Sequence, residues 1–240
     1  MFDNKKTKKK CWDIIKKYYP QYEEKNKIFF EFIKLYLKPE IILIDVGCGR
    51  GYNFPYKEKV RLSIGLDLLD AVSMNSNVHC PLIGDGYKIP LRDNSVDTVI
   101  CQELIEHLKY PLMFFSEASR ILKPSGIFII MTPNILGWRS IISALTSYRF
   151  HVYMNEKLYG VQEHDVFPTY YYANNPWKIK KYLNKLGLDL LRQIMYEPTP
   201  RTLTFSRLAV YLEIFFSSIL RNYKLLSSLR ETIIVCYQKR

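Results

Sequence analysis

The feature that most constrains this 240-residue chain is the segment IDVGCGRG at residues 44–51. The continuous apolar run at 41–46 is typical of a strand buried on both faces of a parallel sheet. Gly47, Gly49 and Gly51 let the following turn adopt left-handed angles or lie directly against a ligand. Their GxGxG spacing differs from the GxGxxG of dinucleotide-binding loops. The turn therefore predicts a nucleotide-like cofactor site, and the alternative is a tight strand-to-loop turn without a ligand.

Further apolar runs of similar length alternate with longer connections along the chain. They lie at residues 62–66, 78–83, 96–101, 127–131, 188–194 and 232–237. This alternation predicts an α/β fold with a doubly wound parallel sheet. Apolar residues at spacings of three and four within 12–37 predict two helices separated by Pro20, which either cover the cofactor site or pack on the sheet. Another helix is predicted to begin after a capping Asn175 and to end at Gly187.

The length suits a single domain with appendages. We expect a helical lid at 1–38, a cofactor-binding half at 39–133, an inserted cap at 134–175, and helices and strands at 176–240. The five cysteines lack metal-ligand spacing, which favours buried thiols over disulfides. Because no apolar run reaches 18 residues and no signal region follows the first lysines, the prediction is a cytoplasmic protein.

The chain carries 35 Lys and Arg against 23 Asp and Glu, a formal net charge of +12. Such a field attracts phosphates, nucleic acid or an anionic membrane face. The alternative is codon bias, because Lys, Ile, Asn and Tyr are abundant together, as A/T-rich genes produce. The charge by itself therefore identifies no partner.

Two more carboxylates follow strand-like runs. Asp67 comes 22 residues after Asp45, and Asp85 follows the third run. Taken singly, each is more often a loop or cap residue. The carboxyl ends of successive parallel strands, however, meet at one crevice, where a carboxylate can accept both hydroxyls of a ribose. The three together favour a nucleotide-like cofactor.

These residues carry a resemblance to a known family. Asp45 two residues before GxGxG, GLD at 65–67 and GDGYKIPL at 84–91 resemble the first three motifs of class I S-adenosylmethionine-dependent methyltransferases. IPLRDNSVDTVICQELIEHL at 89–108 and ILKPSGIFIIMTPN at 121–134 are similar to the later ones. The resemblance implies a Rossmann-like sheet of seven strands, the last antiparallel, and S-adenosyl-L-methionine as the cofactor.

The resemblance also implies roles for individual residues. Asp45 and the glycines would bracket the methionine part of the cofactor, Asp67 would bind the ribose, Leu68 would pack on the adenine, and Asp85 would bind its amino group. The expected cofactor-binding residues are Asp45, Gly47, Cys48, Gly49, Gly51, Asp67, Leu68, Asp85, Gly86 and Gln102. The chain departs from the family pattern in the short segment after the turn, where Pro55 would interrupt the long helix that usually follows. The crevice would then be more open, or covered by the N-terminal helices.

Two histidines, His107 and His164, are the candidate general bases for an oxygen acceptor. Glu103, Glu106 and His107 have helical spacing that would place them on one face. Ubiquinone-pathway O-methyltransferases have a similar ExxEH stretch, which permits a divalent-metal role, although we expect no metal site. The alternative is that Glu106 and His107 only order the loop after the fourth strand.

His164 lies in the segment EHDVFPTYYYANNPWKI, which resembles the acceptor-side segment of methyltransferases encoded with bacterial surface-polysaccharide genes. Tyr172 stands where that segment has an arginine, and Asn175 where it has a threonine. Clustered tyrosines, together with Asn174, suit stacking and hydrogen bonding to a sugar or an aromatic ring. Plain packing before a helix is the alternative.

The apolar segment LAVYLEIFFSSIL at 208–220 has Arg207, Arg221 and Lys224 at its ends and a single acid, Glu213. It could lie on an acidic membrane face and meet a lipid-linked substrate. Alternatively, it buries against its own sheet or against a second subunit in a homodimer.

The leading functional prediction is methyl transfer from S-adenosylmethionine to an oxygen of a small molecule or saccharide, including a lipid-linked one. The net charge suggests an RNA methyltransferase as the alternative, but the fourth strand ends in CQEL rather than the NPPY-type element of base-amino methylation. A further alternative is a regulatory protein that binds the cofactor without catalysis.

Overall fold

The computed structural model describes residues 4–20, 25–51, 56–145 and 167–240. The chain divides into two compact units, which are considered separately. We call them the sheet unit, formed by Phe29–Ile135, Pro168–Ile194 and Ile233–Arg240, and the helical unit, formed by Met1–Ile28, Leu136–Phe167 and Met195–Thr232.

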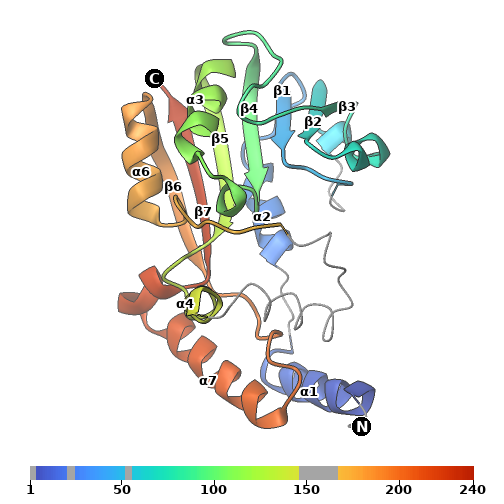
Figure 1. The fold of residues 1–240 in the computed structure, drawn as a ribbon, viewed down its shortest axis with the longest axis vertical. Helices are drawn as coiled ribbons and strands as arrows, with labels where there is room; N and C mark the ends of the chain where they lie inside the picture. Colours follow the sequence, from blue (N-terminus) through green and yellow to red (C-terminus); the bar gives the residue numbers. More distant parts are fainter. Residues whose placement is uncertain (1–3, 21–24, 52–55, 146–166) are drawn as a thin grey trace. The chain divides into compact units, whose positions relative to one another are not determined.

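The sheet has seven strands in the order β3-β2-β1-β4-β5-β7-β6. Their bounds are β1 Ile42–Val46, β2 Leu62–Asp67, β3 Cys80–Ile83, β4 Val96–Gln102, β5 Leu122–Pro133, β6 Leu188–Tyr196 and β7 Thr232–Lys239. The strands from β3 to β5 pair in parallel, and β7 runs opposite to β4 (Figure 1). The predicted doubly wound, seven-stranded sheet with an antiparallel last strand is therefore confirmed.

Most strands begin or end within two residues of the predicted runs, and β5 is the exception. It begins at Leu122, five residues before the apolar run, because Leu122 pairs with Val96 across an irregularity in the ladder. Ser125 has a φ of 63° there, which is unusual for a residue other than glycine. This local irregularity gave no hydrophobic signal in the sequence.

Aromatic side chains form the interior between the sheet and helix α3 (Pro111–Ile121). The rings of Phe114 and Phe115 meet Phe128 of β5 with centroids 6.0 and 6.1 Å apart, and all three are fully buried. Helix α6 (Pro176–Lys185) lies beside α3, where Phe115 meets Tyr182 at 6.3 Å (Figure 1). Edge-to-face and tilted ring pairs of this kind hold neighbouring elements in a fixed orientation.

The predicted signals at the ends of α6 are confirmed. The Asn175 side chain accepts hydrogen bonds from the backbone N–H groups of Trp177 and Lys178 at 2.9 and 3.3 Å. Gly187, directly after the helix, has a φ of 77°. Both residues do what their types favour at helix ends.

The connection after β2 is slight, as predicted, whereas Pro55 in the connection after β1 lies outside the described residues. In the described residues each connection contains only a short 3₁₀ helix, η1 (Tyr56–Glu58) and η2 (Asp70–Met74).

Helix α2 (Lys25–Lys34) buries Phe29, Phe32 and Ile33, and the guanidinium of Arg192 on β6 lies 5.6 Å from the centre of the Phe32 ring.

The helical unit contains α1 (Asn4–Tyr18), α4 (Trp138–Leu145), α7 (Arg207–Asn222) and the 3₁₀ helix η5 (Lys224–Leu229). Cys11 and Ile15 of α1 form a buried cluster with Val210 and Ile214 of α7. The first predicted helix therefore packs on α7. The lid role of residues 1–38 remains a prediction.

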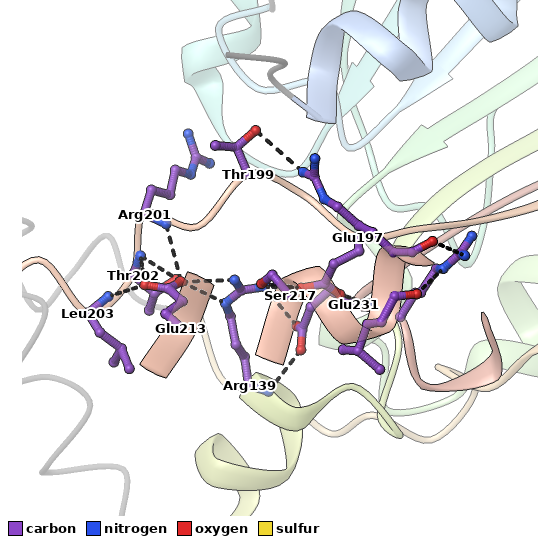
Figure 2. A network of polar contacts seen from close by, with 12 residues as sticks. Arg139, Glu197, Thr199, Arg201, Thr202, Leu203, Glu213, Ser217 and Glu231 are labelled. Atoms are coloured by element: carbon purple, nitrogen blue, oxygen red, sulfur yellow. Dashed lines mark hydrogen bonds and ion pairs between the residues drawn. The ribbon is translucent and has the colours of Figure 1, made fainter. Parts of the chain in front are cut away.

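A buried polar network lies inside the helical unit (Figure 2). Arg139 is the cation at its centre, 2.8 Å from Glu213, 3.4 Å from Glu197 and 3.9 Å from Glu231. The three carboxylates are almost completely excluded from solvent. Burial raises the pKa of Glu231 to about 7. Three acids thus share one arginine, and protonation of Glu231 relieves part of the excess negative charge.

The prediction of buried thiols is correct for four cysteines and wrong for Cys80, which is exposed. Its strand, β3, forms the edge of the sheet and has little burial along its length. An apolar run at an edge cannot be distinguished by composition from one inside the sheet. None of the five thiols is paired in a disulfide.

Within the described ranges, no helix is long and apolar enough to cross a bilayer.

Candidate functional site

The parallel register brings the carboxyl ends of β1, β2, β3 and β4 to the same end of the sheet (Figure 1). Val46 at the end of β1 pairs with Leu66 on one side and with Cys101 on the other. Asp67 of β2 pairs in turn with Ile83 of β3. The glycine turn therefore follows β1 directly between the carboxyl ends of β2 and β4, the place where open α/β sheets bind ligands.

The glycine turn has the backbone that its sequence predicts. Gly47, Gly49 and Gly51 have φ values of 76°, 50° and 88°. A Cβ on Gly47 would lie 3.0 Å from the Leu104 side chain, and one on Gly51 would collide with the Asn75 amide. Among the described residues, a Cβ on Gly49 would meet nothing within 4 Å. Open space therefore lies in front of the middle glycine, where a ligand can approach the backbone.

Asp67 is fixed by the glycine turn. Its Oδ2 accepts a hydrogen bond from the Gly49 N–H at 2.8 Å, and its Oδ1 accepts one from the Leu69 N–H at 3.0 Å. Each carboxylate oxygen has a second lone pair for another donor. The neighbouring Leu68 is 70% exposed, although it is a large apolar side chain. The Asp67 carboxylate has a fixed position and can accept hydrogen bonds from a ribose, and the exposed Leu68 can pack against the attached base.

Asp45 lies deeper, only 2% exposed, and its Oδ1 has no hydrogen-bond partner in the part of the chain that the structure describes. Burial, followed by the nearby charge of Asp67, raises the pKa of Asp45 to about 8. A buried carboxyl oxygen without a partner costs free energy and calls for an explanation. A cationic group such as the ammonium of the methionine part of S-adenosylmethionine would provide the missing partner. The residues present therefore fit this cofactor.

The remaining cofactor candidates, Cys48, Gly86, Asp85 and Gln102, lie in different surroundings. Cys48 is buried at the turn, and burial raises the pKa of its thiol to about 12, so the thiol stays neutral. A Cβ on Gly86 would approach Val46 and Phe114 to 3.4 and 3.5 Å. Asp85 is exposed and its Oδ1 accepts the Tyr87 N–H at 2.8 Å. Gln102 is buried at the end of β4. Their proposed contacts with the cofactor remain predictions.

Glu103, Glu106 and His107 do not share a helical face, so that part of the prediction is wrong. Glu103 has a φ of 50°, and only the 3₁₀ turn η3 (Ile105–His107) follows it. A residue in the left-handed region cannot continue a right-handed helix. The i, i+3, i+4 spacing therefore belongs to a turn and not to an α-helix.

Glu106 instead takes part in a buried polar chain. The Thr132 hydroxyl donates to Glu106 Oε2 at 3.0 Å, and the Asn174 amide donates to the Thr132 oxygen at 2.5 Å. All three residues are at most 4% exposed. Thr132 was not among the predicted site residues, whereas Asn174 was expected beside the tyrosines on the acceptor side. The polar run TPN at 132–134, directly after an apolar strand, was the signal that could have identified Thr132.

The loop at Glu106 and His107 holds the aromatic segment at residues 168–174. The Glu106 carbonyl accepts the Tyr170 N–H at 2.7 Å, and His107 Nδ1 lies 2.9 Å from the Pro168 carbonyl oxygen. The ordering role considered for these two residues is therefore present. The carbonyl can only accept, so Nδ1 carries the hydrogen and, in the neutral ring, the lone pair is on Nε2. His164 lies outside the described residues.

Two exposed aromatic rings lie in this segment. Tyr170 and Tyr172 are 38% and 49% exposed, and their ring centroids are 5.6 Å apart.

In the part of the chain that the structure describes, no group of three or more His, Cys, Asp or Glu could hold a metal ion.

Comparisons with known proteins agree with this geometry. Residues 44–130 match the family model of a methyltransferase domain. A protein of Mycolicibacterium smegmatis described as a probable S-adenosylmethionine-dependent methyltransferase is 37% identical over 97 residues, covering 38% of each chain. A ubiquinone biosynthesis O-methyltransferase of Colwellia psychrerythraea is 26% identical over 52% of this chain and 54% of its own. The chain thus spans about half or less of the length of these curated relatives.

Among solved structures, geranyl diphosphate C-methyltransferase from Streptomyces coelicolor, in complex with S-adenosyl-L-homocysteine, is similar in fold. It superposes with a TM-score of 0.57 at 16% identity, covering 90% of this chain and 79% of its own. Together with the glycine turn and the carboxylates at the strand ends, these matches show that the chain carries a class I S-adenosylmethionine-dependent methyltransferase domain, whose cofactor is S-adenosylmethionine.

Proposed function

We propose that this protein transfers a methyl group from S-adenosylmethionine to an oxygen of a small molecule or a saccharide. The main supporting observation is that the β4 loop, at the cofactor edge of the sheet, also holds residues 168–174 with their exposed tyrosine rings. A lipid-linked saccharide is one acceptor of this class. The O-methyltransferase name of the Colwellia relative supports oxygen as the methylated atom.

His107 is the proposed general base among the described residues. The methyl of a sulfonium is already electrophilic, so the protein mainly has to align the acceptor and remove its proton. With Nδ1–H directed to Pro168, the neutral imidazole presents its lone pair at Nε2. His164 remains a second proposed base. Asp45 and Asp67 would hold the cofactor.

The variant His107→Asn tests this role with little disturbance of the loop. An Asn amide can still donate to the Pro168 carbonyl, but it cannot accept a proton. Turnover should fall by about 100-fold or more, the usual contribution of a general base, with cofactor affinity unchanged. His79→Asn is the matched control, because this histidine contacts Ser63 between β2 and β3 instead. Equal turnover of wild type and His107→Asn would remove His107 as the base.

The acceptor class requires a separate experiment. Labelled methyl transfer from S-adenosylmethionine into fractionated cell extract should place label in small-molecule, saccharide or lipid fractions. Label that enters only RNA, and is lost after ribonuclease treatment, would favour the RNA methyltransferase suggested by the +12 charge. Cofactor binding without transfer to any fraction would favour a non-catalytic regulatory protein.

A further inference from the structure

Helix α7 exposes a row of large apolar side chains along one side. Leu208, Leu212 and Phe215 are 71%, 50% and 58% exposed, and Tyr211 and Phe216 in the same row are exposed as well. Their spacing of three and four residues forms one continuous helical face. A helix on the surface of a globular protein normally presents polar residues on its solvent side. We call these five side chains the outer face of α7.

The opposite side of α7 is already occupied. Val210 and Ile214 pack against α1, and Glu213 lies between them in sequence with no exposed surface. The Glu213 carboxylate accepts backbone N–H groups of Thr202 and Leu203 and pairs with Arg139 (Figure 2). Glu213 is the only acidic residue in the helix. Its burial leaves the outer face without any negative charge.

Positive charge borders the N-terminal end of the outer face. Arg207 begins α7, and α1, which packs against it, contains seven lysines and one aspartate. Lys10 and Arg207 line an open pocket of about 650 Å³ between the two helices, together with Asp13 and Ser206. The apolar walls of this pocket are Ile14, Leu208 and Tyr211. Cations and apolar side chains therefore border the same hollow.

We propose that the outer face of α7, with the adjoining cations of α1, docks on an anionic phospholipid surface. An interfacial helix buries apolar side chains at the boundary between headgroups and acyl chains, while flanking Lys and Arg residues attract anionic lipids. A second copy of the chain fits less well, because its own outer face carries no negative charge to match Lys10 and Arg207. The docking goes beyond the proposed reaction and does not depend on it.

The test uses the full chain and vesicles of two compositions. Wild type should sediment with phosphatidylglycerol-containing vesicles and much less with phosphatidylcholine alone, and high salt should weaken the association. The double variant Leu212→Gln/Phe215→Ser should lose more than tenfold in partitioning. Leu191→Gln is the matched control, since Leu191 is a 48% exposed leucine of the sheet unit. Cofactor binding by calorimetry should stay unchanged in both variants, which shows that the fold is intact.

Each opposite outcome contradicts the proposal. Wild type that does not sediment with anionic vesicles overturns it, as does a double variant that binds like wild type. Equal binding to both vesicle types would remove the role of the cations. A wild-type dimer that the double variant converts to a monomer, without vesicle binding, would assign the outer face of α7 to a second copy.

Discussion

Asp45→Asn should stabilise the cofactor-free protein and weaken its cofactor binding. The wild-type carboxyl is fully buried without a partner on Oδ1, and its pKa is raised from 3.8 to about 8. Between those two values the folded chain keeps a proton that the unfolded chain has released. Stability therefore falls as the pH rises through this window, and it levels off above about pH 8. An amide in the same position has no such pH dependence.

The magnitude follows from the width of that window. The ordinary pKa of an aspartate lies about three units below pH 7, and each unit corresponds to about 1.4 kcal/mol. The buried carboxyl therefore lowers the free energy of unfolding by about 4 kcal/mol at pH 7. The buried Asn amide of the variant lacks some of its hydrogen-bond partners, which costs about 2 kcal/mol and offsets part of this gain. The net gain of about 2 kcal/mol should raise the Tm by roughly 4–8 °C for a chain of this size.

Thermal unfolding between pH 5 and pH 8 measures this effect. The stability gained in Asp45→Asn should grow steadily with pH, because only wild type contains the titrating group at that position. Asp97→Asn is a control of opposite sign. Asp97 accepts the Ile42 N–H and pairs with Lys123, and its pKa is lowered, so removing its charge should cost stability at neutral pH. A pH-independent difference between wild type and Asp45→Asn would refute the reasoning.

Cofactor binding provides the second measurement on the same variant. A cation near Asp45 favours the ionised carboxyl, so wild type should release a proton on binding S-adenosylmethionine at pH 7. Calorimetry in buffers of different ionisation enthalpy should detect this release, and the variant should lack it. Affinity should fall by about ten- to a hundredfold, as expected when a hydrogen bond to a charged group is lost. Unchanged affinity would remove Asp45 from the cofactor site.

Three further variants test other parts of the structure. Asp67→Ala should weaken cofactor binding by about tenfold or more in calorimetry while the circular dichroism spectrum is retained, because the carboxylate held by Gly49 is lost. Gly51→Ala should cost about 1–3 kcal/mol in chemical unfolding, because a φ of 88° and the Asn75 amide both oppose a Cβ. Arg139→Met should cost about 3–5 kcal/mol at pH 8 and less at pH 5, where the buried Glu231, whose pKa is raised to about 7, takes up a proton.

The sequence predicted the features that depend on neighbouring residues. The glycine turn, the apolar central strands and the Asn175 cap are all determined within a few positions, where residue type limits the backbone directly. It did not predict the burial of Glu213, whose arginine partner lies 74 positions away. It also gave the wrong geometry at Glu103, because helical spacing does not exclude a positive φ.

The cofactor side and the proposed acceptor side of the candidate site are attached to the fold in different ways. This difference affects how acceptor specificity can change. The cofactor side is formed by consecutive strand ends, so its residues are tied to the sheet itself. On the proposed acceptor side, the segment with Tyr170 and Tyr172 is held mainly through backbone groups, to the carbonyl of Glu106 and the ring of His107. Because those hydrogen bonds do not use the tyrosine side chains, the rings can be exchanged without disturbing the attachment. Acceptor preference can therefore change by substitution at Tyr170 and Tyr172 while the cofactor side stays intact.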